Sequence, residues 1–236
     1  MKRLPWGWVR WATLPLFVGL CPQVRAGEVS SSPSNPTLLE RPAPPPASSG
    51  LRPVKRFHDG FFLQLSLGPV YLHESWSPSA GGAGATFGGW GTSFEASNGR
   101  SVRPGLIVGG RWQFAAVVDP NESYLGVTTA AVETARFIDI VGAFVDYYPN
   151  PRRGLHLGGA VGVVIATNLD ADYHAHETSW GPAISAHAGY EVFFSSRWSA
   201  GALAQLSVYR YSTTEAGVSS VSDGLLPILA VAFTFN

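Results

Sequence analysis

Large apolar side chains alternate with small or polar ones along most of the chain, and this alternation constrains the fold more than any other feature. In residues 60–74, for example, Phe61 and Leu65 occupy odd positions while Gln64 and Ser66 occupy even ones. In a β-strand, successive side chains point to opposite faces of the sheet. The pattern therefore predicts a strand whose two faces meet different surroundings.

Seven more segments repeat this alternation, so eight strands of about fourteen residues are expected. The predicted strands are 60–74, 86–99, 105–118, 135–148, 154–168, 179–194, 198–212 and 223–235. The fourth segment alternates less cleanly, with Ile138, Ile140 and Phe144 on one face and Asp139 on the other. None of these segments offers the ~20 apolar residues of a membrane-spanning helix.

The second face of the expected strands carries Gly, Ala, Ser, Gln and a few charges rather than large apolar side chains. An apolar exterior around a small, polar interior is typical of transmembrane barrels, whereas a soluble β-protein turns its aliphatic face inward. Backbone groups in lipid must be hydrogen-bonded, so the sheet has to close. The sequence therefore predicts an all-β fold over residues 57–236, an eight-stranded antiparallel up-and-down transmembrane β-barrel.

Polar residues of the second face are expected to form a network inside the narrow lumen. The predicted lumen set is Gln64, Glu95, Arg111, Gln113, Asp139, His187, Glu191 and Gln205. A charge buried there needs a partner, so Arg111 is expected to pair with Glu95, Asp139 or Glu191. The interpretation we favour is a plug of salt bridges and hydrogen bonds, and the alternative is a gated small pore lined by the same groups.

The N-terminal part of the chain differs in composition from the rest. Residues 1–26 have the pattern of a secretory signal peptide, in which Lys2 and Arg3 precede a short apolar stretch and Ala26 ends a small-residue cleavage pattern. Residues 27–56 are rich in Pro and Ser without an apolar period, which predicts a disordered linker. Cleavage after Ala26 removes the single Cys, so disulfide or thiolate chemistry is excluded from the mature chain.

Short and long connections alternate between the expected strands. Short turns are predicted at 100–104, 149–153 and 195–197, and long ones near 75–85, 119–134, 169–178 and 213–222. Arginines gather at the short turns and carboxylates in the long connections. Short periplasmic turns and longer outer loops are the usual asymmetry of such barrels, so the N-terminus is predicted to be periplasmic and four loops to be extracellular, with the cell outer membrane as location.

Several aromatic residues lie toward the strand ends or on the apolar face. Such residues often form girdles at the two membrane interfaces. The predicted interface aromatics are Trp90, Trp112, Tyr147, Tyr148, Trp180, Tyr190 and Trp198.

Three stretches carry a resemblance to known proteins: GFFLQLSLGPVYL, VGAFVDYYPNPRRGLHLGGAVG and the closing LAVAFTFN. They resemble uncharacterised Gram-negative outer-membrane barrels, in the broad class of small OmpA/OmpX-like barrels. The resemblance covers residues 57–236 and implies a C-terminal strand that the barrel-assembly machinery recognises. Here Phe235 is penultimate and Asn236 is last.

One acidic, histidine-containing segment is a weak candidate for cation binding. It comprises Asp170, Asp172, His174, His176 and Glu177. Alternate spacing could direct imidazoles and carboxylates at one divalent cation, although a solvated acidic loop is the preferred interpretation. The functional version would be weak cation bridging to lipopolysaccharide, and outer-membrane lipids and lipopolysaccharide are the expected partners.

Other functions have less support in the sequence. Ser185, His187 and Glu191 share a strand face, but neighbours two apart on a strand are poorly placed for a Ser–His pair, and we expect no enzyme activity and no cofactor. The absence of a basic patch argues against nucleic-acid binding. A soluble lipocalin-like barrel remains an alternative, and it would place Leu63, Val161 and Leu229 inside.

Overall fold

The computed structural model describes residues 60–125, 127–130, 135–169, 175–215 and 218–236. The strands are β1 (Phe61–Pro78), β2 (Ala85–Arg103), β3 (Leu106–Val118), β4 (Asn121–Tyr124), β5 (Val127–Ala130), β6 (Ala135–Tyr147), β7 (Gly154–Leu169), β8 (Ala175–Phe193), β9 (Trp198–Glu215) and β10 (Val218–Phe235). No helix in these residues is long and apolar enough to cross a membrane. The predicted signal peptide and linker lie outside the described residues.

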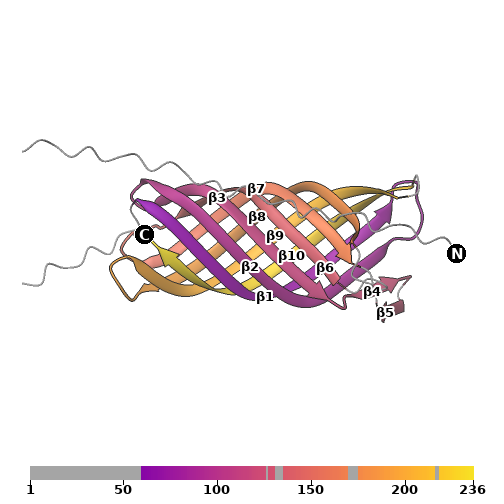
Figure 1. The fold of residues 1–236 in the computed structure, drawn as a ribbon, viewed down its shortest axis with the longest axis horizontal. Helices are drawn as coiled ribbons and strands as arrows, with labels where there is room; N and C mark the ends of the chain where they lie inside the picture. The colour runs from indigo at the N-terminus through magenta and orange to yellow at the C-terminus, as the bar shows by residue number, and fades with distance from the viewer. Residues whose placement is uncertain (1–59, 126, 131–134, 170–174, 216–217) are drawn as a thin grey trace, which may run out of the picture. The chain divides into compact units, whose positions relative to one another are not determined.

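Eight of these strands form a closed barrel (Figure 1). Each pairs antiparallel with its neighbours in the order β1-β10-β9-β8-β7-β6-β3-β2, and β2 pairs back onto β1. The two remaining strands, β4 and β5, form a hairpin that continues the sheet from β2 at one end of the barrel. The predicted eight-stranded antiparallel barrel is confirmed.

The strands extend further than the sequence indicated at the end of the barrel that carries the long connections. A loop was predicted over 213–222, but β9 continues to Glu215 and β10 starts at Val218. The β9–β10 pairing continues through this segment up to Glu215 and Val218. Its Ser and Thr side chains are polar on both faces of the strand, so the apolar alternation that marks the other strands is missing here. Across the ladder, Thr214 and Ser219 hydroxyls lie 3.2 Å apart. The long connections are therefore shorter, and the barrel taller, than expected.

The large apolar side chains of the strands point outward. Val161 and Leu229 are 61% and 66% exposed, and Leu63 has the same parity as the exposed Phe61 and Leu65. This orientation is the reverse of the one a lipocalin-like barrel requires. The lipocalin-like alternative, which placed Leu63, Val161 and Leu229 inside the barrel, is therefore wrong.

Strand β6 has the opposite parity to the one the sequence suggested. Ile138, Ile140 and Phe144 are buried in the lumen, and Asp139 faces outward, where it accepts a 2.7 Å hydrogen bond from Trp112 Nε1. The assignment failed because β6 carries apolar residues on both faces, so periodicity alone could not choose between them.

The lumen is filled by side chains. Beside the polar groups, a large apolar cluster includes Val70, Leu72, Ile138 and Leu226, each without exposed surface. A smaller apolar cluster around Phe62 lies at the end of the barrel that carries the short turns. Eight-stranded barrels are just narrow enough for such filling.

Candidate functional site: a layered polar network in the lumen

The buried polar side chains of the lumen form three groups along the barrel. The long-connection cluster contains Glu74, Arg136, Tyr209 and Tyr211, the central cluster contains Glu95, Ser97, Arg111, Gln113, Gln205 and Ser207, and the short-turn cluster contains Gln64, Asp146, Tyr148, His156, His187, Glu191, Ser199 and Thr234. Their strands bring together residues far apart in sequence. Hydrogen bonds in a dry interior are strong, and unpaired groups there are costly.

The long-connection cluster is built around one carboxylate. Glu74 on β1 forms an ion pair with Arg136 on β6, and it accepts hydrogen bonds from Tyr211 at 2.7 Å and Tyr209 at 2.8 Å. The Arg136 guanidinium also donates to the Tyr211 hydroxyl at 2.6 Å and lies over the Phe87 ring, 4.8 Å from its centroid. This cluster cross-links β1, β6 and β9 through the lumen.

The central cluster contains the predicted partner of Arg111. Nη2 of Arg111 donates to Glu95 at 2.5 Å and to Gln113 at 2.9 Å. Gln205, from the far side of the barrel, donates to the same Gln113 carbonyl oxygen at 2.6 Å. Of the three carboxylates predicted as partners of Arg111, Glu95 is the one that forms the ion pair.

The short-turn cluster contains two imidazoles and two carboxylates. His156 Nδ1 lies 2.8 Å from Asp146 Oδ2, and His187 Nε2 lies 3.5 Å from Asp146 Oδ1. On its other side, His156 Nε2 is 3.6 Å from Glu191 Oε1. The Tyr148 ring stacks on the His156 ring at 4.9 Å between centroids and fixes its plane.

Glu191 collects the hydroxyl and amide donors around it. It accepts from Ser199 at 2.5 Å, from Thr234 at 2.8 Å and from Gln64 at 3.0 Å. The more distant Tyr148 hydroxyl donates at 3.5 Å. This one side chain joins strands β1, β8, β9 and β10 and the residue that follows β6.

Most of the predicted lumen residues lie in these clusters, and Asp139 does not. Gln64, Glu95, Arg111, Gln113, Glu191 and Gln205 are buried, and His187 is nearly so. Sequence reasoning did not select Arg136, Asp146, His156 or the two tyrosines of β9. Arg136 and Asp146 could have been found, since they share one parity on β6 and outnumber Asp139, the single charge of the opposite parity.

The predicted interface aromatics lie on the outer face with one exception. Trp90, Trp112, Tyr147, Trp180, Tyr190 and Trp198 are exposed there. Tyr148 was wrongly assigned, because it is 1% exposed and stacks inside the lumen. Tyr147 ends β6 and Tyr148 follows it directly, and successive residues of an extended chain point to opposite sides, so only one of them faces outward.

The side chains of the predicted cation-binding segment lie outside the described residues, and Ser185 does not pair with His187. Of the weak cation-binding segment, Asp170, Asp172 and His174 lie outside the described residues, as do the side chains of His176 and Glu177 at the start of β8. The Ser185 hydroxyl lies 2.8 Å from that of Ser207, not on His187.

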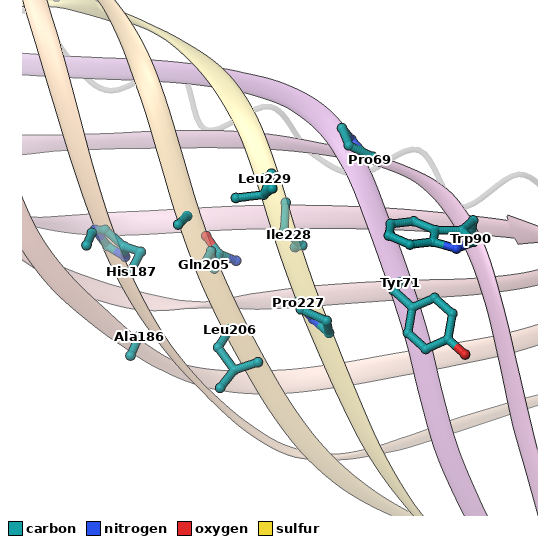
Figure 2. A pocket seen from close by; sticks show the side chains of 12 residues that line it. Pro69, Tyr71, Trp90, Ala186, His187, Gln205, Leu206, Pro227, Ile228 and Leu229 are labelled. Atoms are coloured by element: carbon teal, nitrogen blue, oxygen red, sulfur yellow. The ribbon is translucent and has the colours of Figure 1, made fainter.

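A shallow apolar groove crosses the outer surface over β8, β9, β10, β1 and β2 (Figure 2). Pro69, Tyr71 and Trp90 border it on one side and Ala186 on the other, with Leu206 and Leu229 between them. The small residues Ala186, Ala188 and Ala204 leave it hollow. The groove lies on the same apolar outer face as the exposed aliphatic side chains.

Comparisons with known proteins give likenesses to solved structures only. No protein-family model matches the chain, and no curated protein matches it. Neisserial surface protein A is 16% identical with a TM-score of 0.45, over 75% of this chain and 97% of its own. OprG from Pseudomonas aeruginosa is 12% identical with a TM-score of 0.46, over 76% and 98%. The outer membrane protein AlkL is 15% identical with a TM-score of 0.41, over 84% and 97%. The barrel assignment rests on the strand pairing described above.

Proposed function

We propose that this protein is an outer-membrane barrel of a Gram-negative cell envelope, anchored by its apolar outer face and interacting with its surroundings through the long-connection end. The outward apolar run on β1 extends from Phe61 to Tyr71. Ten rises of ~3.4 Å at a tilt of ~40° give a height of ~26 Å, close to the ~25 Å apolar band of such barrels. Beyond Tyr71, the outward residues His73 and Ser75 are polar.

The β4–β5 hairpin carries the proposal of a surface-interaction role. It continues the β2 ladder beyond the barrel, with Ala85 paired to Tyr124. At its tip Tyr124, Leu125 and Val127 are exposed, Leu125 by 75%. Exposed apolar side chains on an ordered element are typical of contact sites for other molecules.

The filled lumen favours a plug over the narrow channel. Glu74, Gln113 and His156, one from each polar cluster, have no exposed surface. A continuous water path would expose polar groups at each level. In planar bilayers we expect no stepwise conductance from the unmodified protein. Conductance that changes when Arg111 or Glu191 is neutralised would support the channel instead.

Cysteine labelling tests the proposed location and topology. If cleavage follows Ala26, the mature chain contains no cysteine, so single cysteines give a clean signal. We expect a membrane-impermeant maleimide to label Leu125→Cys on intact cells and to label Ser196→Cys, in the short turn after β8, only after permeabilisation. The reverse pattern would invert the topology, and recovery of the protein in a soluble fraction would contradict membrane anchoring.

A charge on the outer face should destabilise the barrel only within the apolar band. Val231 faces outward on β10 and pairs with Leu67 of β1. We expect Val231→Arg to lower the free energy of unfolding in lipid vesicles by about 2–4 kcal/mol, the cost of arginine near the bilayer midplane. The matched control is Ser219→Arg, on the same strand above the band, for which we expect a change within about 1 kcal/mol. Equal effects would argue against a lipid-facing band.

The remaining partner proposals follow from the same placement. Outer-membrane lipids would cover the apolar face, and lipopolysaccharide would surround the long-connection end. The C-terminal strand β10, with Phe233 and Phe235 outward, is the segment proposed for recognition by the barrel-assembly machinery. Export through cleavage after Ala26 belongs to the same proposal.

A further inference from the structure

Three neighbouring strands place Asp146, His156 and His187 together in the lumen near the short turns. Asp146 on β6 is in register with Gly158 on β7, which is in register with His187 on β8. A Cβ atom at Gly158 would lie 2.4 Å from His187 Nε2. The glycine therefore leaves open the space between the carboxylate and the imidazole.

His156 completes the group from a position next to a second glycine. It pairs with Gly189, where a Cβ atom would lie 2.0 Å from His156 Nε2. One ligand atom from each of the three side chains lies within 4.8 Å of the other two. The two histidine–glycine pairs thus bring both imidazoles to one carboxylate.

The cluster contains buried polar atoms without hydrogen bonds. Among the described residues, Asp146 Oδ1, His156 Nε2 and His187 Nδ1 have no hydrogen-bond partner. The three side chains are 1%, 0% and 5% exposed. Asp146 Oδ1 is the orphan that faces the other imidazole, 3.5 Å from His187 Nε2, and a buried atom of this kind calls for an explanation such as a bound ion. His156 Nε2 and His187 Nδ1 are the ring nitrogens that do not face the Asp146 carboxylate.

The charges of the lumen are unbalanced at this cluster. In the described lumen Glu74 pairs with Arg136, and Glu95 pairs with Arg111. Asp146 and Glu191 form no salt bridge with a guanidinium there, although Arg111 attracts Asp146 from a longer distance. Both carboxylates flank His156, at 2.8 and 3.6 Å. Two buried negative charges need two positive ones, which one divalent cation supplies while both imidazoles stay neutral.

We propose that Asp146, His156 and His187 bind one divalent transition-metal ion of the zinc class. Two imidazole nitrogens and a carboxylate oxygen suit zinc and its neighbours rather than calcium or magnesium. The observed separations of 2.8 and 3.5 Å bracket the ~3.4 Å between ligand atoms that are each ~2.0–2.1 Å from a tetrahedral zinc. The fourth position is left for water. Glu191 balances the charge from outside, since its oxygens already accept hydrogen bonds from Ser199 and Thr234.

The experiment uses the folded protein purified in detergent, without a histidine tag and stripped with a chelator. Titration with Zn²⁺ alone should give one ion per chain. In His187→Asn the affinity should fall by more than ~100-fold, because even outer-shell changes at zinc sites cost 10–100-fold. His73→Asn is the matched control, since His73 is an exposed outward residue of β1, and it should bind as the unmodified protein does.

Two further measurements keep the result interpretable if a variant misfolds. Heat-modifiable migration on gels reports whether each variant forms the barrel, and Co²⁺ added to the unmodified protein should give the visible absorption of a tetrahedral site. Absence of both Zn²⁺ binding and the Co²⁺ spectrum in the folded, unmodified barrel would overturn the proposal. So would loss of binding in the His174→Asn, His176→Asn double variant alone, which would assign the ion to residues 170–177. None of these outcomes depends on membrane location or conductance.

Discussion

Replacing Glu74 by leucine should lower the free energy of unfolding by about 3–5 kcal/mol, the usual cost of removing one partner of a buried ion pair. The change leaves the Arg136 guanidinium buried without its carboxylate. It also removes the acceptor of the Tyr209 and Tyr211 hydroxyls. Denaturant unfolding in lipid vesicles, followed by tryptophan fluorescence, measures the difference.

The matched control removes the guanidinium as well. In Glu74→Leu combined with Arg136→Met, no charge of the pair remains buried, so we expect the double variant to recover at least half of the lost stability. Tyr209→Phe, which removes a single donor to Glu74, should cost only about 1 kcal/mol. If the double variant is less stable than both single variants together predict, charge burial is not what holds this end of the barrel.

The second large effect is expected at the opposite end of the lumen. Glu191→Leu should destabilise the barrel by about 3–5 kcal/mol, because it leaves the donors of Gln64, Ser199 and Thr234 buried without their common acceptor. These donors lie on three different strands, so strand closure around β10 should weaken. The unboiled protein should lose its compact gel band at a lower temperature than the unmodified protein.

Two smaller substitutions distinguish the contribution of Glu191 from that of neighbouring groups. Ser199→Ala removes one donor and should cost about 1 kcal/mol. Glu95→Gln removes the charge of the central carboxylate. Among the described residues, Glu95 has only Arg111 and Ser97 as hydrogen-bond donors. We therefore expect this substitution to leave the melting of the short-turn end unchanged. Similar losses for Ser199→Ala and Glu191→Leu would mean that the carboxylate is not the organising group.

Residue patterning alone was enough to predict the barrel. A period of two over eight segments, with large apolar residues on one face and small or polar residues on the other, has few solutions other than a closed sheet with its apolar side outward. The placement of Gln64, Glu95, Arg111 and Glu191 on the second face follows from parity and needs no knowledge of the partners. Where both faces of a strand are apolar, as in β6, parity carries no such information, and Asp139 and the facing of Ile138 were misassigned.

Only the tertiary structure decided which lumen groups meet. Strand register brings His156 and His187 to Asp146, and barrel closure brings Glu74 to Arg136 and the β9 tyrosines. A sequence lists the charges available to each strand, but the distance between two of them depends on the stagger of strands that are not adjacent in the chain. That stagger is a property of the whole closed sheet, and it determines both the ion pairs and the histidine cluster.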